Sequence, residues 1–388
     1  MTVNVSKPAI NVRSKLAELD KPTGIAGEAM LRAETPQEQF NLIGAGRRNL
    51  IINGAMQVAQ RGGSATSVSG NNNTFVLDRF FSRINGSNGA ATVEQSTDAP
   101  DLFSNSLKFT VTTADTSLSA GHYNRVHQEI EGYNIVGLGW GTSSAKPITL
   151  SFWVKSSVTG IYSIGIYNGA VDRSFVQEYT IYAANTWEQK VITVIGPTDG
   201  VWAVDNSAEL RLSFSLGTGT TYDTNGLGYW QNAFNFGSTN NVNLMATLNA
   251  TFQITGVQLE LGKVATPFEH RSYGEELALC QRYYQEYGGS YYYPFTMAVG
   301  ISSTLARSIF TFPVPMRAAP TFTSTNATSI NIDGTSTQTV SSLTGDVSTP
   351  TSHMMNINTS TGFGADGTAC RLYGSNGTYN ALKFDAEL

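Results

Sequence analysis

The chain has 388 residues, only 14% of which are charged, and its formal net charge is −5. Because the longest run of Lys and Arg is the pair Arg47 and Arg48, the basic surface that nucleic-acid binding needs is excluded. No apolar run approaches the ~20 residues of a membrane-spanning helix, so we expect no membrane insertion. The first residues lack the apolar core of a signal peptide, which favours synthesis in the cytoplasm without export by the general secretory route.

Cys280 and Cys370 are too few for a disulfide framework or a cysteine-based zinc site. Average proteins carry roughly 25% charged residues, so this chain is poor in charge. With 38 Gly, 17 Tyr and 19 Phe, the composition is typical of a β-rich protein with many turns. It also fits a protein whose subunits share large buried surfaces.

Residues 1–48 contain most of the obvious helix formers of the chain. Pro22 and Pro36 divide them into pieces of a few turns, and helices that short are marginal in water. The pieces have apolar side chains to bury, namely Leu16, Leu19, Met30, Leu31, Phe40, Leu42 and Ile43. The segment is either a flexible tail or an anchor that folds against a larger assembly, and we favour the anchor.

Residues 49–272 change to an apolar period of two, which is typical of strands. In ITLSFWVKS, Leu150, Phe152 and Val154 point to one face of a strand and Trp153 to the other. About ten such strands follow one another without a long helix, which predicts a two-sheet sandwich, most plausibly a jelly roll. Gly256 interrupts the last strand of this region and indicates a β-bulge.

A segment with the features of a helix follows the predicted sandwich. Ser272 and Glu275 have the spacing of a capping box, so we predict a connecting helix in residues 273–290 that runs to Tyr287. The helix would carry two apolar stripes, one with Leu277, Cys280 and Tyr284 and the other with Leu279, Tyr283 and Tyr287. One stripe can pack on the sandwich, whereas the second has no obvious partner in one chain. We therefore expect these side chains to lie between two bodies, and we predict that they meet copies of themselves in an oligomer.

Residues 291–388 return to short predicted strands separated by Gly, Asn and Asp turns, and we expect a smaller second β domain there. PVPMRAAP, residues 313–320, has too much proline for a central strand and reads as an edge or crossing segment.

Four stretches resemble fibre proteins of tailed bacteriophages: GRRNLIINGAMQVAQRG (46–62), LDRFF (77–81), ITGVQLELGKVATPFEHRSYGEELALCQRYYQ (254–285) and PVPMRAAPTF (313–322). The first three frame a domain that is similar to jelly-roll carbohydrate-binding modules. Residues 1–48 are similar to the virion-attachment end of fibres from phages of marine bacteria. The resemblance implies a homotrimeric virion component that attaches to other virion proteins through residues 1–48, without cofactor or catalysis. It leaves open whether the fibre sits on the tail or the capsid, and it assigns no individual binding residue.

Glycan recognition needs flat aromatic faces together with amides or carboxylates for the hydroxyl groups. Trp153 could form such a platform on the outer face of its sheet, or it could pack under a loop or a neighbouring subunit. Trp187 starts a strand, a position that favours the core. The long loop of residues 217–243 carries Tyr222, Asp223, Tyr229 and Trp230, which suit sugars or equally an oligomer interface or self-packing.

Catalysis finds little support in the sequence. A depolymerase needs two carboxylates about 5 to 9.5 Å apart, and the sequence cannot pair the candidates Asp78, Glu129, Glu131, Asp172 and Glu178. Asp78 and Arg79 read as a structural ion pair. His122 and His127 have a spacing that suits no metal site, and nucleotide-binding motifs are absent. We predict a non-enzymatic fibre protein that contacts host surface glycans, with a structural capsid fibre or decoration protein as the alternative and a depolymerase as a third reading.

Overall fold

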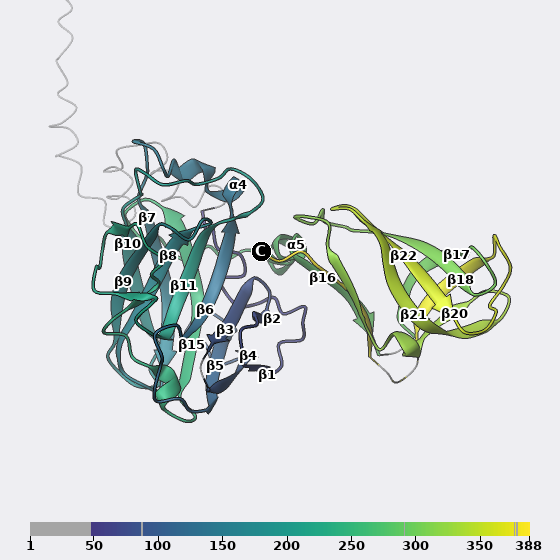
Figure 1. The fold of residues 1–388 in the computed structure, drawn as a ribbon, viewed down its shortest axis with the longest axis horizontal. Coiled ribbons are helices and arrows are strands. Elements are labelled where there is room, and N and C mark those ends of the chain that lie inside the picture. Colours follow the sequence, from purple (N-terminus) through teal and green to yellow (C-terminus); the bar gives the residue numbers. More distant parts are fainter. Residues whose placement is uncertain (1–47, 87, 291, 376, 378) are drawn as a thin grey trace, which may run out of the picture.

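The computed structural model describes residues 48–86, 88–290, 292–375, 377 and 379–388, which form two β lobes joined by a short helix (Figure 1). The predicted attachment residues Leu16, Leu19, Met30, Leu31 and Phe40 lie outside the described residues. In the described part of the chain, none of the helices has the length and hydrophobicity to span a bilayer.

The first lobe is an antiparallel β-sandwich of the jelly-roll type, as the sequence predicts. Its six-stranded sheet has the order β1 (Thr66–Val68), β4 (Ala90–Ser96), β5 (Ser106–Thr113), β15 (Thr251–Leu261), β7 (Ile148–Ser156) and β10 (Glu188–Val194). Its seven-stranded sheet has the order β13 (Trp230–Gln231), β9 (Ser174–Ile181), β8 (Gly160–Asn168), β11 (Ala208–Thr218), β6 (Tyr123–Glu131), β3 (Phe80–Asn85) and β2 (Thr74–Leu77). Short elements complete the lobe: α4 (Gly132–Ile135), η1 (Val136–Leu138), η2 (Leu244–Ala246), and the parallel pair β12 (Asp223–Thr224) and β14 (Gly237–Ser238).

The core of the sandwich follows from the period of two. Phe152 on β7 is fully buried and packs against Phe214 on β11 of the facing sheet, with ring centroids 5.0 Å apart. Trp153, on the opposite face of β7, is only half-buried, which confirms the predicted alternation. Gly256 adopts a φ of +60°, and the pairing of β15 with β7 shifts register there, which confirms the predicted bulge.

The second lobe is a closed six-stranded barrel with a three-stranded sheet beside it. The barrel has the order β17 (Pro294–Gly300), β18 (Leu305–Thr311), β22 (Ser352–Thr359), β21 (Thr337–Ser348), β20 (Ile330–Asp333) and β23 (Ala369–Gly374). The three-stranded sheet consists of β16 (Tyr284–Gly289), β24 (Asn380–Asp385) and β19 (Thr321–Thr325), and η3 (Ala327–Ser329) follows β19. A smaller C-terminal β domain is therefore present.

Helix α5 (Tyr273–Gln281) lies between the lobes and begins with the predicted capping box: Ser272 accepts from the backbone N–H of Glu275, whose carboxylate accepts from Ser272. The prediction that the helix continues to Tyr287 is wrong. The chain leaves the helix at Arg282, and its next residues form β16, paired with β24. The chain forms a strand there because tyrosine and the two glycines at the end of β16 have low helix propensity.

The reason for expecting an oligomer contact at α5 needs correction. Cys280 and Tyr283 are fully buried and Tyr284 is 4% exposed within a single chain. Cys280 and Tyr283 pack with Ile52, Val58, Leu277, Leu279 and Leu388 of the same chain, and Tyr287 packs on Phe310 and Phe384 of the second lobe. Side chains of both stripes are covered by chain segments that are distant in sequence, so no other copy is needed to cover Cys280, Tyr283 or Tyr284.

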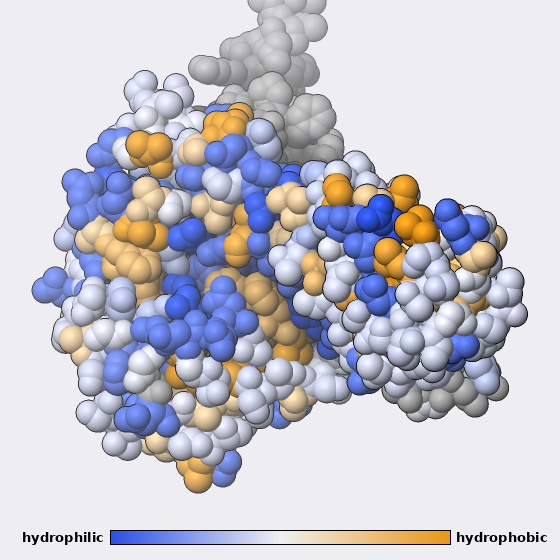
Figure 2. All heavy atoms as spheres, turned by 45° about the vertical axis from the view of Figure 1, so that its right-hand side comes forward, coloured by the Kyte–Doolittle hydropathy of each residue, from blue (hydrophilic) through white to orange (hydrophobic). Residues whose placement is uncertain are grey.

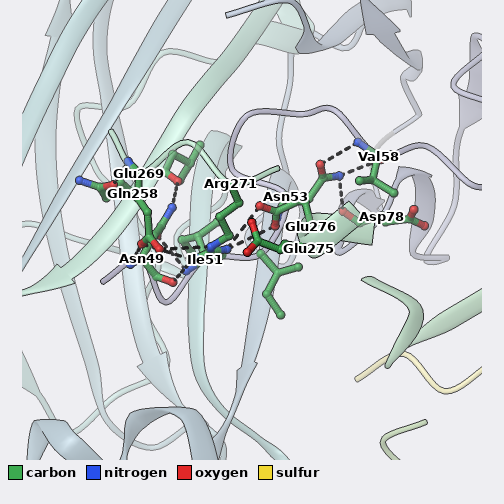
Figure 3. Close-up of polar contacts among 12 residues, drawn as sticks. Asn49, Ile51, Asn53, Val58, Asp78, Gln258, Glu269, Arg271, Glu275 and Glu276 are labelled. Atoms are coloured by element: carbon green, nitrogen blue, oxygen red, sulfur yellow. Dashed lines mark hydrogen bonds and ion pairs between the residues drawn. The ribbon is translucent and has the colours of Figure 1, made fainter. Parts of the chain in front are cut away.

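A polar network fixes α5 to the first lobe (Figure 3). The Arg271 guanidinium donates to the carbonyl oxygens of Asn49 (2.6 Å) and Ile51 (3.1 Å) and lies 3.3 Å from the Glu276 carboxylate. Glu276 also accepts from the backbone N–H of Asn53. The Asn53 side chain, fully buried, donates to the carbonyl oxygens of Val58 and Asp78. Buried amide and charged groups are therefore hydrogen-bonded to partners about 200 positions away in the sequence.

Residues 48–62, 77–81, 254–285 and 313–322 converge on this junction. Residues 48–62 and 254–285 supply the network just described. The stretch 77–81 contributes Asp78 and Arg79. The stretch 313–322 contributes Arg317, whose backbone N–H donates to Arg282 and whose guanidinium donates to Asn206 and Ala386. These motifs thus build the connection between the lobes.

Candidate functional site

The structure separates the five aromatic and acidic residues that the sequence proposed for glycan binding. Trp153 lies on the outer face of the six-stranded sheet. Tyr222 and Asp223 belong to the segment that folds over the seven-stranded sheet, and Tyr229 and Trp230 lie at the β9 edge of that sheet. They therefore do not form one site.

The aromatic residues around Tyr222 pack on one another. The Tyr222 ring lies 5.1 Å from Tyr123 and 5.3 Å from Phe236, and Phe234 and Tyr167 complete the cluster. Partial burial raises the pKa of the neighbouring Asp223. The sequence left both sugar binding and packing open for this loop. The part of the loop around Tyr222 packs on its own sheet.

Trp230 belongs to a group of three tryptophans. Its ring lies 5.3 Å from Trp140 and 5.6 Å from Trp202. Each of the three indole N–H groups donates to a backbone carbonyl, those of Lys146, Asp199 and Ile195. Because the indole N–H groups are hydrogen-bonded within the chain, Trp230 has a packing role. Its neighbour Tyr229 is 58% exposed.

The outer face of the six-stranded sheet brings two other tryptophans together. β7 and β10 are antiparallel neighbours, with Trp153 opposite Gln189 and Val154 opposite Glu188. Trp187 directly precedes β10, beside Lys155 of β7, whose ammonium lies 5.6 Å from the indole ring. Both tryptophans are half-buried. The expectation of a core position for Trp187 is wrong because odd-numbered residues of this strand alternate outward while Ile192 and Val194 are buried.

Asp98 organises the polar groups of this face. Its carboxylate accepts from Lys155 at 2.5 Å, from the indole N–H of Trp187 at 3.2 Å and from the Gln253 amide at 3.3 Å. Partial burial raises the pKa of Asp98, but the hydrogen bonds from Lys155 and Trp187 outweigh it, so that the pKa lies below its usual value. Asp98 is therefore an ionised carboxylate in a fixed position. We name this surface, made of Asp98, Trp153, Lys155, Trp187, Gln189 and Gln253, the Trp153–Trp187 face.

The bulge at Gly256 positions one end of the face. A Cβ atom at this position would lie 2.7 Å from the Phe103 ring and 3.1 Å from Trp153. Phe103 in turn packs edge-on against Phe268, with centroids 5.0 Å apart. The absence of a side chain at residue 256 lets Phe103 and Trp153 approach each other over the sheet.

The carboxylates considered for catalysis make separate contacts. Glu129 binds His127 and Arg211, Glu131 binds Arg282 and Tyr283, Asp172 accepts from Asn168, and Glu178 accepts from Ser238 and Asn240. The predicted pair of Asp78 with Arg79 is wrong: Asp78 binds Arg61 at 3.1 Å, and Arg79 binds Glu387. Asp78 and Arg79 form the turn between β2 and β3, where Arg79 has a φ of +70°, and their side chains reach different partners.

Two further observations bound the chemistry. Among the described residues, no group of three or more His, Cys, Asp or Glu side chains could hold a metal ion. A cleft of about 480 Å³ lies where the lobes meet, lined by Arg61, Tyr284, Thr321, Thr323, Lys383 and Asp385. Figure 2 shows the hollow between the lobes. Arg61 is held there by three carboxylates, those of Asp78, Asp385 and Glu387.

The sequence reasoning missed Trp187, Asp98, Lys155 and Gln253. The sequence did contain a signal for Trp187. In WEQKVITV every second residue points outward, and this alternation places Trp187 on the outward face, as Trp153 is on its own strand. Asp98 lies in a connection between strands and reaches the face only through folding, so no local pattern marks it.

Neither a protein-family model nor a curated protein matches the chain. Three of the solved structures that match are similar at low identity. The enzymatically active domain of tailspike protein 4 from bacteriophage CBA120 is 17% identical, and the match covers 55% of this chain and 21% of that chain, with a TM-score of 0.30. A family 11 carbohydrate-binding module from Clostridium thermocellum, in complex with a mixed-linked tetrasaccharide, is 12% identical over 49% of this chain and 91% of its own, with a TM-score of 0.26. Modules of a Clostridium thermocellum xylanase complexed with xylohexaose are 12% identical over 51% and 29%, with a TM-score of 0.27.

Proposed function

We propose that this chain is a glycan-binding structural protein and that the Trp153–Trp187 face holds the saccharide. One observation carries the proposal: two half-buried tryptophans share a sheet face with the Asp98 carboxylate, the Lys155 ammonium and the exposed Gln189 amide, while the buried Gln253 amide donates to Asp98. Sugar rings offer apolar C–H faces for indole rings and hydroxyl groups that both donate and accept. A hydroxyl group can donate to Asp98 and accept from Lys155, so this mixture of groups suits a neutral saccharide.

The other tryptophans support the same choice by elimination. Trp140, Trp202 and Trp230 donate their indole N–H groups to backbone carbonyls and pack on one another. The indole N–H of Trp187 instead binds Asp98, a side chain whose second oxygen meets Lys155 and Gln253. The face is thus held rigid before a ligand arrives, which lowers the entropic cost of binding.

The proposal includes the fibre role that the resemblance implies. The chain would attach to other virion proteins through residues 1–48, assemble as a homotrimer in the virion and contact host surface glycans without catalysis. The support is the set of four stretches that resemble phage fibres.

A glycan array probed with the full chain tests the binding proposal. We expect wild-type protein to bind a subset of glycans, Trp187→Ala and Trp153→Ala to lose at least about tenfold in affinity, and Tyr229→Ala to bind as wild type does. Tyr229 is a matched control because it is an exposed aromatic residue that the sequence favoured. Undiminished binding by both tryptophan variants would exclude this face.

A purely structural role on the capsid is the second candidate. The observation that favours it is the internal use of the aromatic residues around Tyr222 and Trp230, which leaves fewer rings for ligands. Electron microscopy of particles, with an antibody against the second lobe, distinguishes tail from capsid. A depolymerase would release sugar from host envelopes, which we do not expect.

A further inference from the structure

The outer wall of the barrel carries a row of apolar side chains across four adjacent strands. Ile309 on β18 lies opposite Met354 on β22, which lies opposite Val347 on β21. On the other side of β18, β17 presents Met297 and Val299. Four of the five are at least half exposed: 65% for Met297, 51% for Val299, 67% for Ile309 and 50% for Val347. We call these five residues the apolar wall.

The pattern is unusual for a sheet face that meets water. The inner residues of the same strands, such as Ala298, Phe310 and Met355, already fill the barrel core. The outward residues are therefore not needed for the fold, and an antiparallel sheet normally places polar side chains there. Apolar patches above a few hundred Å² are rare on monomers and mark interaction sites. Strongly apolar residues also reach the surface of the right-hand lobe in Figure 2.

The charges around the apolar wall are paired within the chain. Arg307 lies 3.4 Å from Asp346, and Arg371 lies 2.9 Å from Asp333. Arg307 pairs with Val299 in the barrel, and Arg371 pairs with Met297. The rim thus has no excess of either sign, and an identical surface could approach without repulsion between like charges. A membrane surface is disfavoured because the rim lacks a cluster of cations.

We propose that the apolar wall is the surface through which a second copy of this chain docks. In a homotrimer, equivalent side chains meet one another where they lie at the three-fold axis, and a patch that is apolar in the centre and neutral at its rim suits such a contact. The inference deepens the assembly part of the proposed function and is independent of the glycan part. It moves the contact between copies from α5, which the chain itself covers, to the barrel.

Analytical ultracentrifugation of the full chain tests this surface. We expect the wild type to be a multimer at micromolar concentration, and Ile309→Lys and Met297→Lys each to weaken association at least about tenfold. Val264→Lys, a change at a 71% exposed apolar residue of the first lobe, should leave the mass unchanged. Ile309→Thr keeps a β-branched residue and provides a milder variant with the strand preserved.

Two results would overturn the proposal. A monomeric wild type at tens of micromolar would remove the assembly itself, and a multimer that persists in both lysine variants would place the contact elsewhere. The Trp187→Ala variant should retain the wild-type mass, so that loss of glycan binding and loss of assembly are read separately. Thermal unfolding of each variant shows whether the barrel still folds.

Discussion

Arg79 and Glu387 are 308 positions apart in the chain, yet their side chains form a buried ion pair between the two lobes. The Arg79 guanidinium also lies 3.5 Å from the centroid of Tyr283, and Glu387 lies 3.4 Å from Arg61. The junction of the lobes is therefore ionic and aromatic as well as apolar.

The first prediction concerns this pair. Glu387→Ala leaves the Arg79 charge buried without its carboxylate, which typically costs about 3–5 kcal/mol. We expect a loss of this size in the free energy of unfolding, measured by chemical denaturation. Asp333→Ala, which breaks an exposed pair with Arg371, should cost less than about 1 kcal/mol. Equal losses in the two variants would contradict the role of the junction.

The second prediction concerns pH. Burial, and then the charge of Arg125, lowers the pKa of His127 to about 3. Below the usual histidine pKa of about 6.5, the unfolded chain binds a proton at this residue and the folded chain does not. The contribution of His127 to stability therefore falls by at most about 1.4 kcal/mol per pH unit as the pH falls. Glu129, whose pKa is about 2, adds to this loss only below its ordinary pKa of 4.5.

His127→Phe isolates this effect between pH 6.5 and 4.5. The substitution keeps a ring beside Phe81 and Tyr167 and removes the titrating group. We expect the free energy of unfolding of the variant, relative to that of the wild type, to rise as the pH falls through this window. Burial raises the pKa of Asp78 to about 7, which adds stability at lower pH, but this effect is common to both proteins. Burial also lowers the pKa of His353, so the difference between variant and wild type is the quantity to measure. Parallel curves would show that His127 is protonated in the folded chain.

The third prediction concerns the bulge. Gly256→Ala adds a Cβ atom 2.7 Å from the Phe103 ring at a φ of +60°. A positive φ in a residue other than glycine costs about 1–2 kcal/mol, and the close contact adds to this cost. We expect reduced stability together with weaker glycan binding, because Phe103 and Trp153 must shift. Gly274→Ala, at an open helix position, is the control; it should leave glycan binding unchanged and should not reduce stability, because alanine favours a helix more than glycine does.

The fourth prediction separates packing from recognition among the tryptophans. Trp230→Ala removes a ring that contacts Trp140, Trp202 and Phe175, and we expect a loss of about 3 kcal/mol in stability. Trp187→Ala, at the sheet surface, should cost much less stability and lose glycan affinity. Fluorescence-detected unfolding and binding to the same glycan compare the two variants, and the reverse order of effects would contradict the assignment.

Local patterns in the sequence predict the local features of this fold. The alternation of Leu150, Phe152 and Val154, the capping box at Ser272 and the bulge at Gly256 each depend on a few neighbouring residues, and the structure confirms them. The end of α5 could not be read in this way. It depends on β24, which pairs with Tyr284 and its successors from about 100 positions away.

The candidate site was predictable only in part. Trp153 follows from the strand period, and Trp187 could have followed from the same rule. Asp98 joins them through a fold that brings it beside Lys155 and Gln253, which are 57 and 155 positions away. The stretch 254–285, in contrast, serves the junction.

The most direct measurement is the titration of the full chain with a glycan that it binds, followed through the indole N–H signals in NMR spectra. The chain has five tryptophans and hence five such signals. We expect the signals of Trp153 and Trp187 to shift with ligand, while those of Trp140, Trp202 and Trp230 stay in place. Shifts confined to the latter three, with Trp153 and Trp187 unmoved, would contradict glycan binding at the Trp153–Trp187 face.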